Sequence, residues 1–160
     1  PHVIEYRRGL LPEPEREFYI SGDAFVKDWI IKVRNDVPDA PVLVTAGGLL
    51  HYFEENKVIS LLRMIGQSGN MEVVFDTVNK KGMAMMQKKY MKQVGHADAQ
   101  MFFYVDAAKE LAAKIRGNVK VIAEEPYYRY IPKNGLKLST KVSMAVSDQF
   151  KMVKMIHLKL

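Results

Sequence analysis

The segment from Ala40 to Glu55 constrains the fold of this chain more than any other part of the sequence. It is apolar and rich in β-branched residues up to Ala46, breaks at Gly47-Gly48, and leads into an amphipathic helical pattern. Such a pattern predicts a buried strand, a tight turn and a helix. Ligands of open α/β sheets bind beyond the carboxyl ends of the strands, and glycines let a ligand approach the backbone closely. We therefore predict a binding site at this turn.

The same alternation of strands and helices continues along the chain. Apolar, β-branched runs bounded by turn residues predict five strands, at 17–23, 42–46, 71–77, 119–125 and 153–160. Since such alternation is typical of a mostly parallel sheet covered by helices, we predict an α/β fold in a single domain spanning residues 1–160.

Helical periodicity and end signals predict the helices between these strands. We expect them at 3–8, at 26–33, from about Glu54, from Lys80 to about Val94 with Gly95 closing it, at 107–115 and at 139–150. Asp106 and Ser139 are the predicted caps of the last two helices. The inward residues predicted for the long basic helix are Met83, Met86, Tyr90 and Val94, and those predicted for the last helix are Val142, Ala145, Val146 and Phe150.

Composition narrows the functional classes. The chain has no cysteine, which excludes disulfides, a thiolate nucleophile and cysteine-ligated metals, and is typical of a reducing cytoplasm. We predict no metal site. Its apolar runs are far shorter than the roughly 20 residues needed to span a bilayer, so no membrane partner is expected.

The net charge of +6 is unevenly distributed. Residues 1–80 carry nine Lys and Arg against twelve Asp and Glu, whereas residues 81–160 carry fifteen against six. Two interpretations stay open: a solvated lysine surface, or a basic half that attracts an anionic partner. The second would make the chain a non-catalytic α/β binding module for nucleic acid or another anion, although RNA-binding signatures are absent and nucleic acid is the weaker hypothesis.

Four motifs in order carry a family resemblance: 1–11, Asp23 followed by Trp29, 46–55 and 74–77. Together they resemble the carboxyl-terminal two thirds of the leucine carboxyl methyltransferase family, in its tetracenomycin-polyketide-synthesis (TcmP-like) branch. The resemblance implies a Rossmann-like class I methyltransferase sheet, mostly parallel with an antiparallel C-terminal strand. It also implies S-adenosylmethionine-dependent O-methylation of a carboxyl or other acidic oxygen on a small, polyketide-like molecule.

One family motif has no counterpart here. The glycine-rich first motif of the family precedes the region that this sequence resembles, and the chain contains no G-x-G segment. The resemblance therefore implies an N-terminally truncated sheet, and we expect this chain alone to bind S-adenosylmethionine weakly or not at all. A truncated sheet also exposes a strand edge through which copies of the chain can associate.

The resemblance assigns cofactor contacts to two turns. Gly22, Asp23 and Ala24 would meet the adenine, and Ala46, Gly47, Gly48 and Leu49 would line the cleft beside the sulfonium. Each assignment has a plain alternative, because aspartates are common in turns and paired glycines often form a tight turn and nothing more.

His51 is the best-placed candidate for a general base, with Tyr52 beside it in the predicted catalytic pair. A carboxylate acceptor needs no base, whereas a phenol, with a pKa of about 10, does. The alternative interpretation of His51 is structural, since a single histidine is a weak signal. Asp76-Thr77 ends a strand on the same edge, and capping of the following helix is its favoured interpretation over substrate contact.

Overall fold

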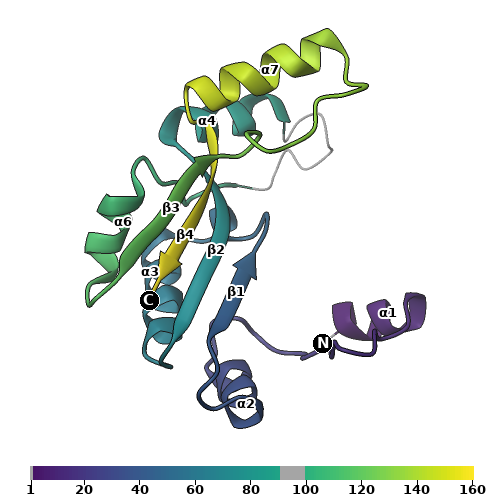
Figure 1. The fold of residues 1–160 in the computed structure, drawn as a ribbon, viewed down its shortest axis with the longest axis vertical. Coiled ribbons are helices and arrows are strands. Elements are labelled where there is room, and N and C mark those ends of the chain that lie inside the picture. The colour runs from purple at the N-terminus through teal and green to yellow at the C-terminus, as the bar shows by residue number, and fades with distance from the viewer. Residues whose placement is uncertain (1, 91–99) are drawn as a thin grey trace. The chain divides into compact units, whose positions relative to one another are not determined.

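A computed structural model describes residues 2–90 and 100–160, with side chains described outside 89–90. The chain divides into two units, Pro1–Ala40 and Pro41–Leu160, each described by itself below (Figure 1). That residues 1–160 form a single domain stays a prediction.

The first unit contains two helices, α1 (His2–Leu10) and α2 (Asp28–Asp36), which confirm the first two predicted helices. The strand predicted at 17–23 is wrong, because this segment is irregular. Side chains satisfy its backbone where a strand would need a neighbouring strand: Tyr19 N–H donates to Glu13 Oε1, and Arg8 donates to the Tyr19 carbonyl at 3.0 Å. The apolar composition of the segment did not reveal these local partners.

The second unit is built on a four-stranded sheet. Its strands are β1 (Val42–Ala46), β2 (Met71–Val78), β3 (Lys120–Pro126) and β4 (Val153–Lys159), in the order β1-β2-β4-β3. β1 and β2 are parallel, and β4 is antiparallel to both of its neighbours. Three strands therefore run in one direction and the last runs against them, as predicted.

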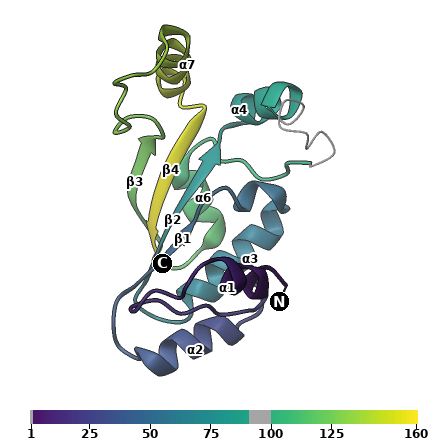
Figure 2. The same cartoon turned by 90° about the vertical axis from the view of Figure 1, so that its right-hand side faces the viewer.

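Two helices cover one face of this sheet, α3 (Glu55–Gly66) and α6 (Ala108–Ile115) (Figures 1 and 2). Both are amphipathic, and their apolar sides meet alternate residues of the strands. The largest side chains of this core, all less than 4% exposed, are Phe75, Phe103, Leu50, Leu62, Ile65, Met71, Leu111, Ile156 and Leu158.

The helix predicted from Lys80 begins there. It comprises α4 (Lys80–Met85) and a π-helical turn, η2 (Met86–Tyr90). Gly82 packs so closely on Met152 that an added Cβ would lie 2.3 Å from the Met152 carbonyl oxygen. Met83 and Met86 are half-buried, whereas the predictions for Val94 and Gly95 fall outside the described residues.

Both predicted caps are wrong in their partners. Asp106 Oδ1 accepts the Lys80 N–H at 3.0 Å and thus serves the start of α4, while the start of α6 is served by Glu124, which accepts the Ala108 N–H at 3.1 Å. Ser139 lies inside α7 (Leu138–Gln149), which begins after Lys137 without a side-chain cap. The carboxylates that bond the first amides of α4 and α6 come from residues distant in the sequence, which the local sequence does not show.

The burial predicted for α7 is also wrong. Val142, Ala145, Val146 and Phe150 are exposed, and the buried residues of this helix are Met144 and Ser147. The reason is the position of α7, which lies beyond the ends of β3 and β4 in both views (Figures 1 and 2). Only a narrow strip of the helix meets the sheet there.

None of the helices within the two described ranges combines the length and the apolar character needed to cross a bilayer.

Candidate functional site at the ends of β1 and β2

The carboxyl ends of β1 and β2 are joined by a hydrogen bond. After β1 ends at Ala46, the chain turns at Gly47 and Gly48, and the Gly48 N–H donates to Asp76 Oδ1 at 2.6 Å. Asp76 stands near the end of β2. A charged acceptor makes this a strong hydrogen bond, which fixes the turn to the neighbouring strand.

The turn is open on its outer side. Gly48 has a φ of +63°, in the left-handed region that favours glycine, and a Cβ added at Gly47 or Gly48 would meet no heavy atom within 4 Å. Ala46 is half-buried, and Leu49 is 40% exposed. The backbone is therefore accessible to a ligand at the place where the sequence predicts one.

The segment after the turn is a single 3-10 turn, η1 (Leu50–Tyr52). Leu50 anchors it in the core, and His51 is only 7% exposed. The His51 carbonyl accepts the N–H groups of Phe102 and Phe103, at 2.8 and 3.3 Å. The His51 and Tyr52 rings lie 4.4 Å apart at an angle of 56°, and Tyr52 is 40% exposed. The predicted catalytic pair is therefore brought together behind the glycine turn.

The surroundings of His51 favour its neutral form. Burial lowers the pKa of the imidazole below 6.5, and the negative charge of Asp76 opposes this only in part. Among the residues that the structure describes, no side chain is hydrogen-bonded to the ring. A buried, neutral imidazole next to an open turn has the right state to accept a proton.

Asp76 is the residue that sequence reasoning undervalued. The helix after β2 is capped by Asn79, whose Oδ1 accepts the Gly82 N–H at 2.7 Å, so the favoured capping role of Asp76 is wrong. The Asp76 carboxylate accepts the Gly48 N–H, and its negative charge raises the pKa of His51. The available signal was its position at the end of the strand that follows the glycine turn in the chain.

A buried ion pair, Lys154–Glu124, stabilises the segment that carries the donors to the His51 carbonyl. Lys154 is 1% exposed, and its Nζ donates to Glu124 Oε1 at 2.6 Å and to the Asp106 carbonyl at 2.8 Å. Burial of Glu124 opposes its ionisation, but hydrogen bonds from Lys154 and Ala108 outweigh it and lower the pKa of the carboxyl. The pair thus fixes the segment that precedes α6. Phe102 and Phe103, whose N–H groups donate to the His51 carbonyl, lie earlier in the same segment.

The turn of Gly22, Asp23 and Ala24, which the resemblance assigns to the adenine, lies in the first unit. Asp23 Oδ1 accepts the Phe25 N–H at 2.9 Å, and the Ala24 carbonyl accepts the indole N–H of Trp29 at 2.9 Å. Gly22 and Asp23 are exposed and Ala24 is half-buried. Asp23 therefore stabilises its own turn, and its proximity to Gly48 stays a prediction.

A cavity of about 310 Å³ lies between α3, α6 and the segment before α6. Its walls include Glu55, Phe102, Tyr104, Asp106 and Glu110, and it contains none of the predicted site residues. No group of His, Asp or Glu within the described ranges is arranged to hold a metal ion.

Comparison with known proteins identifies similar chains. The sequence is 32% identical over 128 residues to the S-adenosyl-L-methionine-dependent methyltransferase dpfgK of Gibberella zeae, covering 72% of this chain and 41% of that protein. The chain thus spans about two fifths of the length of the curated relative it matches. No family model matches it.

A solved structure has the same fold. The chain superposes with a TM-score of 0.63, at 12% identity, on a DUF574 family protein from Streptomyces avermitilis, covering 99% of this chain and 62% of that one. Together with the strand order and the antiparallel last strand, this confirms the predicted Rossmann-like α/β sheet, mostly parallel with an antiparallel C-terminal strand.

Proposed function

We propose that residues 1–160 form part of an S-adenosylmethionine-dependent methyltransferase that modifies a carboxyl or other acidic oxygen of a small, polyketide-like molecule. The similarity to a methyltransferase of that cofactor class is the observation that carries the proposal. The open turn fixed by the Gly48–Asp76 hydrogen bond supplies the place for the reaction. The leucine carboxyl methyltransferase resemblance, in its TcmP-like branch, supports the choice of acceptor.

The residues present fit part of the cofactor. The exposed glycine backbone, with Ala46 and Leu49, would lie beside the sulfonium, and Gly22, Asp23 and Ala24 would meet the adenine. When bound, S-adenosylmethionine supplies an electrophilic methyl group. Because residues 1–160 contain no glycine-rich G-x-G turn, we propose that residues outside this range hold the methionine half. The chain alone should then bind the cofactor weakly.

His51 determines which acceptors can react. Its neutral imidazole would take a proton from a hydroxyl acceptor, whereas a carboxylate is already ionised at neutral pH. Tyr52, in ring contact with His51, would orient the imidazole or the acceptor.

The test is methyl transfer by the full protein that contains residues 1–160. With labelled S-adenosylmethionine and a panel of aromatic carboxylic acids and phenols, carboxylic acids should be methylated. His51→Gln should leave transfer to carboxylates within about threefold and lower transfer to phenols about 100-fold or more. Absence of transfer to every acceptor, with folded protein and bound cofactor, would overturn the proposal.

A second candidate follows from charge. The basic half makes a binding module for an anionic partner the alternative function. Random oligonucleotides should then bind at low salt, with an affinity that falls steeply as salt rises. Lack of retention at low salt would exclude nucleic acid as that partner.

Two further proposals concern the state of the protein. Among the described strands, β1 is paired on one side only, so its other edge is a candidate for self-association. Light scattering that shows only monomer at high concentration would exclude this. We also place the protein in the cytoplasm, because it contains no cysteine.

A further inference from the structure

A row of apolar residues lies exposed along α7, where a helix usually carries polar residues. Leu138, Val142, Val146 and Phe150 are 77%, 54%, 46% and 62% exposed. They follow one another every four residues, so they form a continuous row along the helix. The buried Met144 and Ser147 lie on roughly the opposite side, at 100° per residue. We call the four exposed residues the α7 row.

Lysines lie at both ends of this row. Lys137 precedes the first residue of α7, the half-buried Lys141 lies one turn into the helix, and Lys151 follows Phe150. The start of α4 is bonded to the end of α7, since Asn79 Nδ2 donates to the Phe150 carbonyl at 3.0 Å and Asn79 N–H donates to the Met152 carbonyl at 3.1 Å. These bonds bring the exposed Lys80 and Lys81 to the same end.

Acidic groups near the row are few and engaged. Between residues 127 and 151 the only acidic residue is Asp148, which accepts the Tyr128 N–H at 3.1 Å. Glu125, just before this segment, is paired with Arg129. The segment 127–151 therefore combines an apolar row with an excess of positive charge, and Asp106, which accepts the Lys80 N–H, is the acidic group at the start of α4.

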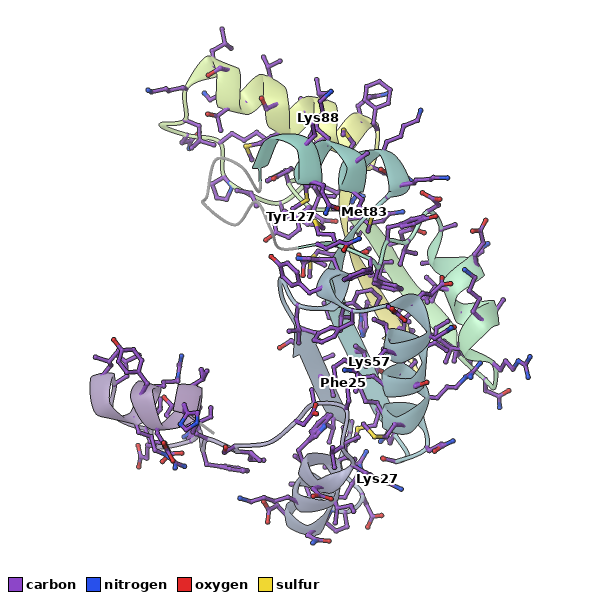
Figure 3. The ribbon with its side chains drawn as sticks, turned by 180° about the vertical axis from the view of Figure 1, so that it is seen from behind. Phe25, Lys27, Lys57, Met83, Lys88 and Tyr127 are labelled. Atoms are coloured by element: carbon purple, nitrogen blue, oxygen red, sulfur yellow. The ribbon has the colours of Figure 1, made fainter. Side chains whose placement is uncertain are left out.

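We propose that the α7 row and its lysines dock the protein on the surface of an anionic lipid bilayer. Side chains stand out from the outer side of α7, which lies at the end of its unit, so they form a ridge that fits a deformable surface better than a fixed groove (Figures 1 and 3). An apolar row that enters the boundary between headgroups and acyl chains, with lysines at the headgroups, is the arrangement of interfacial helices. A second copy of the chain would place these lysines against one another, which opposes that occupant.

This inference does not depend on a membrane-spanning segment, and it does not depend on the proposed methyl transfer. No helix in the part of the chain that the structure describes is long and apolar enough to span a bilayer, whereas docking needs only a surface row. It replaces the expectation that no membrane partner exists. It would also bring the end of the sheet that α7 contacts, formed by β3 and β4, close to the lipid surface (Figure 1).

The test is flotation of the 160-residue chain with vesicles of phosphatidylcholine alone or with about 30% phosphatidylserine. Binding should require the anionic lipid and weaken as salt rises. Lys137→Gln/Lys141→Gln should lower the partition coefficient about 25-fold, at roughly fivefold per lysine. Val142→Ser/Val146→Ser should lower it about tenfold.

The matched control is Val3→Ser/Leu10→Ser, which changes two exposed apolar residues of the helix α1. It should leave the partition coefficient unchanged, and circular dichroism should show all variants folded. Equal binding to neutral vesicles, or equal loss in the control, would overturn the proposal. So would the absence of vesicle binding together with a dimer that only the α7 variants dissociate, because the row would then join two copies of the chain.

Discussion

The Gly48 amide and the Asp76 carboxylate, 28 residues apart in sequence, meet at 2.6 Å and tie together the carboxyl ends of two parallel strands. The strand register brings Ala46 opposite Phe75, so the first residues of the turn after β1 lie beside Asp76. Through this contact the glycine turn, the buried His51 and the Asp76 carboxylate lie together at the carboxyl ends of β1 and β2.

Removing the charge of Asp76 should lower the pKa of His51. Because the Asp76 carboxylate raises the pKa of His51 against the effect of burial, Asp76→Asn should lower that pKa further. The His51 ring protons, followed by NMR against pH, report it directly. Glu72→Gln serves as the control, since Glu72 bonds His157 at 2.8 Å and not His51. An unchanged His51 pKa in Asp76→Asn would show that the two groups do not interact.

A comparison of alanine variants at Gly48 and Gly69 separates the effect of backbone strain on stability from the effect of an added Cβ on ligand binding. Both have positive φ, +63° and +69°, and both have open space where a Cβ would be added. Alanine at either position should therefore cost about 1 kcal/mol of unfolding free energy. Only Gly48→Ala should weaken binding of S-adenosylmethionine, measured by calorimetry on the full protein that contains this chain. Equal binding by the two variants would mean that Gly48 serves the turn alone.

The Lys154–Glu124 pair should be strongly coupled. Glu124→Gln leaves a buried lysine without its counter-charge, which should cost about 3 kcal/mol, and Lys154→Met removes the charge itself. The double variant should be less destabilised than the sum of the two single variants, as measured by urea unfolding. Glu55→Gln, which breaks the exposed pair with Lys114, is the matched control and should cost less than about 1 kcal/mol. Additive effects at Lys154 and Glu124 would contradict the pairing.

Stability should depend on His51 at mildly acidic pH. The folded-state pKa of His51 lies below 6.5, so the unfolded chain binds a proton first as the pH falls. The unfolding free energy contributed by this group is therefore complete above pH 6.5 and decreases below it, down to the folded pKa. His51→Gln should show a smaller decrease over this window in urea unfolding series. An identical pH dependence in the variant would mean that His51 is not held neutral by the fold.

The sequence predicted most of the second unit because local signals and tertiary structure agree there. The β-branched run at Val42–Ala46 forms the predicted strand β1, but the prediction that it is buried is wrong, because β1 is an edge strand and Leu43 is 56% exposed. The alternation at Met71–Val78 fits β2, which is buried on one side. Lys154 also left a signal, since the two-residue period of β4 places it on the buried side with Ile156 and Leu158.

The rest depended on partners that are distant in the sequence. The Tyr19 backbone is hydrogen-bonded to side chains in the segment where a strand was expected. The Ala108 N–H at the start of α6 donates to the Glu124 carboxylate rather than to that of the adjacent Asp106. The apolar side of α7 was predicted to be buried because periodicity shows that a side is apolar, but not what covers it. The contact of Asp76 with Gly48 needed the strand register, which the sequence does not state.

The most direct test of the central claim is a titration of the ¹⁵N-labelled chain with S-adenosylmethionine, followed by amide chemical shifts at millimolar ligand. This measurement detects the weak binding expected of residues 1–160 alone. We predict shifts concentrated at Ala46–Tyr52, at Asp76 and at the proposed adenine contacts Gly22, Asp23 and Ala24, with little change at the α3–α6 cavity. Shifts absent from the Gly48 turn, or confined to that cavity, would contradict the claim.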